Sequence, residues 1–327
     1  MKAPFIASSR AGRLIRDDAP VKFWLSRPDL RRYSGLVQRR SVTQTGVTAW
    51  FLGTSSVLLS DGQTAILIDG FVTRPGLARV AFGRIAPDRN LVRQAYERLA
   101  TPPIAAVVCV HSHYDHALDA PVWASLTGAQ LVGSESTANI GRGLGIPEQC
   151  LRVVGDGDVR LFGEFELTFV ESEHSPGDHY PGTVDAPLVP PRRSREWRTG
   201  AVYSVFVSHP RGTVLLHASA GFRRGALRGR HADVVYLGVG TLGKQPVEFV
   251  EAYWDEVVPA TGARRVVLVH WDDFFRSLDE PLRPMPYPAD DLDVTLRRLS
   301  ALAERDDREL LLPVAWQPAD PFASSLD

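Results

Sequence analysis

Cysteine is scarce in this sequence, whose 327 residues include only two, Cys109 and Cys150. Two cysteines support neither a disulfide framework nor the closely spaced thiols of a cysteine-rich metal site. Cys109 lies inside an apolar run, where a reduced and buried thiol is expected. This cysteine usage fits a reducing compartment, and we therefore expect a cytoplasmic protein.

Long apolar runs and net charge are also lacking. No stretch approaches the roughly 20 apolar residues that span a bilayer, and the first ten residues do not read as a secretory signal. The formal net charge is −1, so no overall field attracts nucleic acid or an anionic membrane. We expect a small-molecule substrate, no nucleic-acid partner and no membrane span, whereas the oligomeric state stays open.

The most informative segment is residues 111–116, His-Ser-His-Tyr-Asp-His, which directly follows an apolar run at 104–110. A strand that ends there delivers three imidazoles and a carboxylate onto one short turn. These are the side chains that a divalent metal such as Zn²⁺ prefers. Packed together without a metal, they would carry a large desolvation cost or repel one another when protonated. The pattern therefore predicts metal ligands at His111, His113, Asp115 and His116.

Consecutive residues cannot surround a metal, so further ligands must come from elsewhere in the chain. Two isolated histidines follow strand-like runs: His174 comes after residues 165–170, and His270 comes after residues 265–269. A turn-forming segment follows each of them. Strand, histidine and turn in this order are typical of a site at the edge of a β-sheet, so we expect both histidines to join the site.

With these motifs in order along most of the chain, the sequence resembles the metallo-β-lactamase superfamily. Residues 46–56 resemble its opening strand and Gly-rich turn, and residues 66–70 resemble its strand that ends in an aspartate. Residues 111–116 match its HxHxDH motif, and His174 and His270 stand where its third and fifth motifs belong. The resemblance implies an α/β (α+β) protein, a four-layer αββα sandwich with metals at one edge.

The resemblance also implies two groups of metal ligands. They are His111, His113 and His174 for one metal, and Asp115, His116 and His270 for the second. Asp69 would orient the ligand turn rather than bind a metal, since carboxylates next to liganding imidazoles set their tautomer and angle. From the residues alone, a plain strand-end cap is the alternative for Asp69. The expected cofactor is Zn²⁺, one or two ions per chain, with manganese or iron as other candidates.

One position departs from the family pattern. The fourth motif is a strand followed by an aspartate that bridges the two metals, whereas here the strand at 213–216 leads to Ser219. A neutral hydroxyl is a poorer ligand than a carboxylate and does not offset the charge of two dications. Three outcomes are open: one firmly bound metal, compensation by Asp272 or Asp273, or His217 turning inward as a ligand or catalytic proton donor.

Residues 1–45 are polar and rich in arginine, and we expect an N-terminal extension that is packed on the core or partly ordered. Residues 46–327 are expected to form one hydrolase domain. The spacing of apolar residues predicts helices at 89–99, 120–127, 247–258 and 291–304. Residues 179–198 contain four prolines and a basic cluster, which predicts a long irregular loop directly after His174.

Substrate contacts are harder to assign. Basic clusters at 192–198 and 223–230 are either solvated faces or sites for an anionic group, which suits the planar guanidinium. Arg223 and Arg224 closely follow the fourth motif, so they are candidates to reach the metal edge. Candidate apolar contacts are Tyr114 in the ligand turn and Trp197 in the loop, with ordinary packing as the alternative.

The ligand set points to hydrolysis. A zinc ion lowers the pKa of bound water to near 7 and polarises the bond under attack. We therefore expect metal-bound hydroxide to attack an ester- or lactone-like small molecule, with Asp115 orienting the water and carrying its proton. One alternative is a phosphodiesterase of nucleic acid or a phospholipid headgroup, which would use the arginine clusters. The other is a non-catalytic metal-binding protein whose site has decayed at Ser219.

Overall fold

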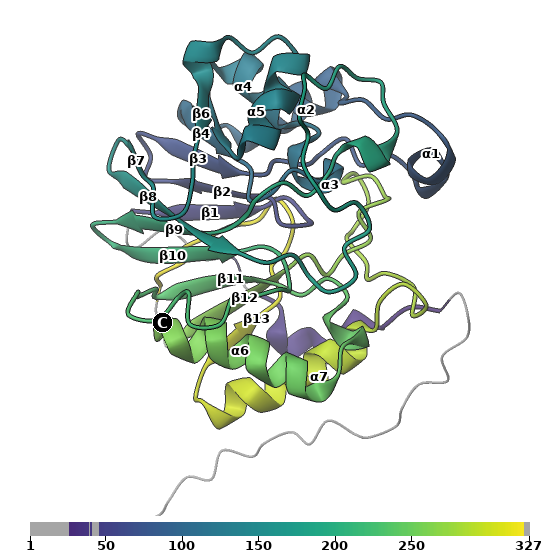
Figure 1. Ribbon diagram of the computed structural model, residues 1–327. Helices are drawn as coiled ribbons and strands as arrows, with labels where there is room; N and C mark the ends of the chain where they lie inside the picture. The colour runs from purple at the N-terminus through teal and green to yellow at the C-terminus, as the bar shows by residue number, and fades with distance from the viewer. Residues whose placement is uncertain (1–25, 39, 41–45, 324–327) are drawn as a thin grey trace, which may run out of the picture.

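Two β-sheets packed face to face form the centre of the protein, and helices cover both outer faces (Figure 1). The structure, a computed structural model, describes residues 26–38, 40 and 46–323. Each sheet has seven strands. The predicted four-layer αββα sandwich is therefore confirmed.

The first sheet lies on the side of the sandwich that is uppermost in Figure 1. Its strands are β1 (Thr48–Phe51), β2 (Val57–Ser60), β3 (Ala65–Ile68), β4 (Ile104–Val108), β5 (Gln130–Gly133), β6 (Leu151–Val153) and β14 (Pro318–Ala319). Their spatial order is β14-β1-β2-β3-β4-β5-β6. β3, β4, β5 and β6 run parallel to one another, whereas β14, β1, β2 and β3 alternate in direction.

The second sheet repeats this arrangement with later parts of the chain. Its strands are β7 (Val159–Phe162), β8 (Phe165–Ser172), β9 (Val202–His209), β10 (Gly212–His217), β11 (Val234–Gly238), β12 (Arg265–Val269) and β13 (Glu309–Leu311). They lie in the order β13-β12-β11-β10-β9-β8-β7. The strands from β10 to β13 are parallel, and those from β7 to β10 are antiparallel.

The described residues form seven α-helices, most of which cover the two outer faces. They are α1 (Leu77–Phe82), α2 (Arg89–Leu99), α3 (Tyr114–Ala117), α4 (Ala120–Thr127), α5 (Glu135–Gly143), α6 (Val247–Thr261) and α7 (Leu292–Arg305). In Figure 1, α2, α4 and α5 lie on the first sheet, and α6 and α7 lie under the second. α2 begins where the Asp88 carboxylate accepts hydrogen bonds from the backbone N–H groups of Asn90 and Leu91. α6 ends at Gly262, whose φ of 73° suits glycine.

The central strands β2 and β3 read as continuous apolar runs because both faces of their sheet are covered there. Every residue of β2 and β3 is buried. Alternate residues serve different layers: Val57 and Leu59 belong to the core that includes the second sheet, and Leu58 belongs to the core under the helices. This double burial rigidly supports the loops that leave the strand ends.

The predicted elements agree with the structure. The helices expected at 89–99 and 120–127 match the bounds of α2 and α4, and those at 247–258 and 291–304 match α6 and α7 to within a turn. The loop expected at 179–198 contains one 3-10 turn, η3 (Ser194–Glu196), and is otherwise irregular.

Part of the N-terminal extension is described. Residues 30–36 form the 3-10 helix η1 (Leu30–Leu36), whose Tyr33 hydroxyl donates a 2.7 Å hydrogen bond to Asp293 in α7. Residues 1–25, 39 and 41–45 lie outside the described residues, so the division at residue 45 stays a prediction. Among the residues that are described, no helix is long and apolar enough to cross a membrane.

Several strands end at the same edge of the sandwich. β3 and β4 are parallel neighbours in one sheet, and β10 and β12 have the same direction in the other. β8 also ends there, because it is antiparallel to β9, which in turn is antiparallel to β10. Every candidate ligand follows one of these strand ends by at most eight residues.

Candidate metal centre

The ligand turn follows β4. His113 precedes the short helix α3, and its carbonyl accepts a 3.0 Å hydrogen bond from the His116 N–H. This single helical turn brings His116 back beside the residues before it. The Asp69 carboxylate accepts a 3.0 Å hydrogen bond from the Val110 N–H, which ties the end of β3 to the start of the turn.

The structure brings all six predicted ligands together in two triads. The first triad is His111, His113 and His174, and the second is Asp115, His116 and His270. Within each triad, one potential ligand atom of every residue lies within 4.8 Å of those of the other two. The triads adjoin, since the ring centroids of His111 and His116 are 3.7 Å apart.

Hydrogen bonds decide which nitrogen of each ring is free in the first triad. His113 uses Nε2, which lies 3.0 Å from the Thr199 hydroxyl oxygen, so Nδ1 remains. His174 uses Nδ1, which lies 3.0 Å from the Ser175 carbonyl oxygen, so Nε2 remains. Each ring therefore keeps one nitrogen for a metal.

In the second triad, three atoms converge on one point. His116 Nδ1 lies 2.8 Å from Asp69 Oδ2, which leaves its Nε2 free. The Asp115 Oδ2 atom lies 3.6 Å from this Nε2 and 3.2 Å from His270 Nε2. Asp69 itself touches no other ligand of the triad and also accepts a hydrogen bond from Ser55 Oγ. Its contacts are those of a carboxylate that orients His116.

His111 shows that the residues fit a metal. Its ring is buried, yet neither ring nitrogen has a hydrogen-bond partner within the described structure. Burying a polar group without a hydrogen-bond partner costs free energy. A metal bound between His111 and the imidazoles around it would supply the missing partner. Burial, followed by the neighbouring His116 and His113, holds the pKa of His111 well below its usual range, so the ring is neutral and able to bind a metal.

The remaining charges agree with this assignment. Burial and the adjacent His113 lower the pKa of His174 to about 4. Burial alone would raise the pKa of Asp115, but the imidazoles of His116 and His270 outweigh it and hold that pKa below its usual range. At neutral pH the second triad therefore carries a carboxylate, whereas the first triad has only neutral rings.

Ser219 stands at the edge of the same site but contributes no charge. Its hydroxyl oxygen accepts a 2.9 Å hydrogen bond from the Ser175 N–H, next to the ligand His174. The two aspartates that were considered as substitutes are both ion-paired with arginines. Asp272 forms a 2.7 Å ion pair with buried Arg74, and Asp273 forms a 2.7 Å ion pair with Arg27. Asp272 also lines the cavity beside the metal centre, and compensation for Ser219 by either aspartate stays a prediction.

His217 is not part of the metal centre, which corrects its assignment as a catalytic candidate. Its Nδ1 lies 2.7 Å from Ser204 Oγ, and its Nε2 lies 2.8 Å from the Gly221 carbonyl oxygen. Its ring packs beside Tyr253 of α6, 5.5 Å between centroids. The contacts with Ser204, Gly221 and Tyr253 hold this ring inside the core and away from the two triads.

The buried His217 gives a pH prediction. Burial lowers its pKa to about 4, against which the Gly221 contact acts only in part. The unfolded chain therefore binds one more proton than the folded chain between about pH 6.5 and pH 4, and stability falls as the pH falls through that window. Between pH 7 and pH 4.5, we expect the free energy of unfolding to fall by about 2 to 3 kcal/mol less in His217→Gln than in the wild type.

Urea unfolding of the metal-free protein at both pH values measures this effect. Other buried histidines keep part of the pH dependence in the variant, so the comparison is between slopes and not between absolute stabilities. Equal pH dependence of wild type and variant would contradict a neutral, buried His217.

The predicted substrate residues separate into two groups. Tyr114 lines a cavity beside the metal centre. Trp197 is fully buried in the core under the helices, so it packs and does not form an apolar wall for a substrate. Arg223 is ion-paired with Glu171, Arg224 lies over the Phe222 ring, and neither lines the cavity. The expectation that these two arginines reach the metal edge is corrected.

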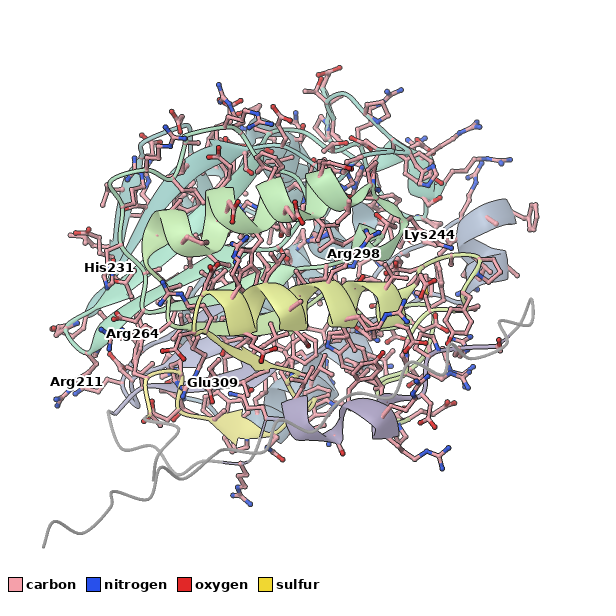
Figure 2. All side chains as sticks on the ribbon, turned by 90° about the horizontal axis from the view of Figure 1, so that it is seen from below. Arg211, His231, Lys244, Arg264, Arg298 and Glu309 are labelled. Atoms are coloured by element: carbon pink, nitrogen blue, oxygen red, sulfur yellow. The ribbon has the colours of Figure 1, made fainter. Side chains whose placement is uncertain are left out.

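The cavity has a volume of about 680 Å³ and opens from both triads. Its apolar lining comes from α1, from the segment after His270 and from the turn before α7: Leu77, Val80, Ala81, Phe274, Phe275, Met285, Pro288 and Ala289. Among the described residues that line it, Lys244 is the only lysine or arginine. Figure 2 shows α6 and α7 side by side, with Lys244 at one end of this helical layer and Arg264 and Glu309 at the other.

Two residues beside the first triad, Asp178 and Thr199, were not predicted from the sequence. Asp178 lies 3.3 Å from His113 Nε2, and the Thr199 hydroxyl lies beside both. Asp178 is four residues after His174, and this short spacing is the one sequence feature that could have drawn attention to it. Thr199 ends the long loop and has no such feature.

The comparisons with known proteins agree with this geometry. The family model of the metallo-beta-lactamase superfamily matches residues 49–306, most of the chain. The chain belongs to this superfamily and is a metallohydrolase of its fold, with a metal site of two His/Asp triads. A search of curated proteins gave no significant match.

Solved structures share the fold at low sequence identity. A possible metal-dependent hydrolase from Veillonella parvula is 14% identical with a TM-score of 0.50, covering 85% of this chain and 99% of that one. CmlA, a diiron beta-hydroxylase from Streptomyces venezuelae, is 14% identical with a TM-score of 0.51, covering 85% of this chain and 54% of that one. Igni18, a metallo hydrolase from Ignicoccus hospitalis, is 13% identical with a TM-score of 0.49, covering 84% and 95%.

Proposed function

We propose that this protein is a zinc-dependent hydrolase of a small ester- or lactone-like molecule with an apolar body. The observation that carries the proposal is the cavity: the two triads open onto a space lined mainly by apolar side chains. Such a lining binds an acyl chain or ring by burial of apolar surface.

The ligand types favour zinc, and iron is the second candidate. Imidazole with a single carboxylate suits Zn²⁺, and imidazole also binds iron. The name of CmlA describes that fold neighbour as a diiron enzyme, so metal analysis has to include iron as well as zinc and manganese. We propose one or two ions per chain, with His111, His113 and His174 holding one and Asp115, His116 and His270 the other.

When bound, the metal supplies an acidified water and polarises the carbonyl under attack. The protein supplies position and a proton acceptor. Asp115 is the one carboxylate in the two triads, and its Oδ2 lies between His116 and His270. We assign it to hold the attacking water and to receive its proton at a carboxylate oxygen. Tyr114, Phe274 and Phe275 line the same space with apolar ring surface.

A phosphodiesterase is less well supported because no residue of the two arginine clusters is among the residues that line the cavity. Arg223 is neutralised by Glu171. Nucleic acid and phospholipid headgroups carry phosphate charge, which needs several cations for binding. A cavity with Lys244 as its only lysine or arginine among the described lining residues offers too few.

The test is a panel of purified substrates with metal analysis of the same protein. The panel contains lactones, thioesters, aryl esters of increasing acyl length and bis(p-nitrophenyl) phosphate. We expect zinc in the protein, turnover of the esters or lactones that rises with apolar size, and little turnover of the phosphodiester. Preferential turnover of the phosphodiester would contradict the proposal, and so would a fully loaded protein that hydrolyses no ester.

We also propose a cytoplasmic location. Cys109 and Cys150 are both free thiols, and Cys109 is buried. Burial raises the pKa of the Cys109 thiol well above its usual value, so this thiol is inert and needs no oxidising compartment.

A further inference from the structure

The first triad lacks the negative charge that the second has. Its three ligands are neutral imidazoles, and the neighbouring position 219 is a serine. The second triad includes Asp115, and its His116 is also held by Asp69 at 2.8 Å. The first triad therefore has no carboxylate of its own, and a carboxylate in contact with one of its imidazoles would offset part of the charge of a bound dication.

Asp178 is a carboxylate in contact with an imidazole of the first triad. Its Oδ1 lies 3.3 Å from His113 Nε2, and its Oδ2 accepts a hydrogen bond from the Thr199 hydroxyl. The same Thr199 oxygen lies 3.0 Å from His113 Nε2. Since the Thr199 hydrogen goes to Asp178, its oxygen accepts from His113, so Nε2 carries the ring proton. His113 Nδ1 then has a free lone pair for the metal.

Backbone contacts fix this arrangement, although Asp178 and Thr199 stand at the two ends of the long loop. The Thr199 N–H donates a 3.0 Å hydrogen bond to the Tyr180 carbonyl. Ser112, inside the ligand turn, donates from its backbone N–H to the Thr199 carbonyl at 2.9 Å. Gly200 has a φ of +65°, and a Cβ there would lie 2.6 Å from the Ser112 hydroxyl oxygen. The loop end is therefore closely packed on the metal-binding turn.

We propose that Asp178 and Thr199 form a positioning pair for His113, and that Asp178 acts on the first metal through this imidazole and not as a ligand. A carboxylate on the far nitrogen of a liganding imidazole sets its tautomer and raises its basicity, and its loss typically costs about 10- to 100-fold in metal affinity. Asp69 has the same relation to His116 in the second triad. The inference rests on the proposed metal centre, not on which bond is hydrolysed.

The test measures zinc affinity at one triad at a time. His270→Ala removes a ligand of the second triad and leaves the first, and His174→Ala does the reverse. In the His270→Ala background, we expect Asp178→Asn to weaken zinc binding about 10- to 100-fold, as measured by competition with a chromophoric chelator. In the His174→Ala background, the same substitution leaves zinc affinity unchanged, whereas Asp69→Asn weakens it.

Two further variants separate positioning from folding. Thr199→Val removes the hydroxyl and lowers affinity at the first triad, whereas Thr199→Ser keeps the hydroxyl and restores it. Asp185→Asn is the matched control, since Asp185 is an exposed carboxylate in the same loop. Thermal unfolding without metal shows whether each variant is folded.

The outcomes are distinct from those of the proposed function. If the wild type binds zinc and Asp178→Asn binds it equally well in the His270→Ala background, the positioning pair is overturned and the hydrolase stands. Equal loss at both triads would also overturn the pair, because it would mark a general disturbance of the fold. A wild type that binds zinc but hydrolyses no ester overturns the proposed function alone, and one that binds no zinc overturns both.

Discussion

Asp115→Asn will lower kcat/KM for ester hydrolysis by about 1000-fold, while the protein stays folded. The substitution removes the only carboxylate of the two triads and with it the proton acceptor that we assign to the attacking water. General-base catalysis contributes about 10²- to 10⁴-fold to rate in enzymes. Asparagine has nearly the same shape, so the change in activity reports the loss of charge.

Metal content has to be measured in the same preparation, because Asp115 is also a metal ligand. The activity is therefore compared at zinc concentrations that load the variant fully. Asp279→Asn, which replaces an exposed carboxylate, is the control and should leave kcat/KM unchanged. Wild-type activity in Asp115→Asn would show that another group receives the proton.

Asp272→Asn will destabilise the protein by about 3 to 5 kcal/mol, because it breaks a buried ion pair from one side. The Arg74 and Asp272 side chains are both fully buried, and Nη2 and Oδ2 are 2.7 Å apart. The substitution leaves the Arg74 guanidinium charged, out of contact with water and without a counter-ion. Urea unfolding of metal-free protein at pH 7 measures the loss.

The double variant Arg74→Met with Asp272→Asn tests the cause. Removing both charges also removes the desolvation cost, so part of the lost stability should return. A loss below about 1 kcal/mol in Asp272→Asn would mean that solvent reaches the pair, since exposed pairs contribute that little. A double variant no more stable than Asp272→Asn would show that packing, and not charge, is responsible.

Asp272 follows the ligand His270 by two residues, and its second carboxylate oxygen also has a partner. Asp272 Oδ1 accepts a 2.7 Å hydrogen bond from the Thr54 N–H, and the Thr54 carbonyl accepts one of 2.5 Å from the His270 N–H. Asp272 therefore links the turn that contains Thr54 to the turn that follows β12. Gly53 is needed in this turn, because a Cβ there would lie 2.0 Å from an Arg74 nitrogen.

The sequence by itself determined the parts of this protein that depend on local pattern. Apolar runs that end in histidine predict strands with ligands at their ends, and the strands β4, β8 and β12 lie where those runs predict them. Apolar residues at helical spacing likewise predict α2 and α7. The six ligand candidates could be named because each is a metal-binding type at a strand end, a property of a few consecutive residues.

Only the tertiary structure decided what each polar side chain faces. His217 and Ser219 are two residues apart, yet the first is directed into a core between Ser204 and Gly221, and the second lies at the metal edge. Asp178 and Thr199 meet at His113 because the loop closes on the ligand turn. Contacts of this kind join residues distant in the chain, and no local pattern records which distant hydroxyl, carboxylate or arginine will be the neighbour.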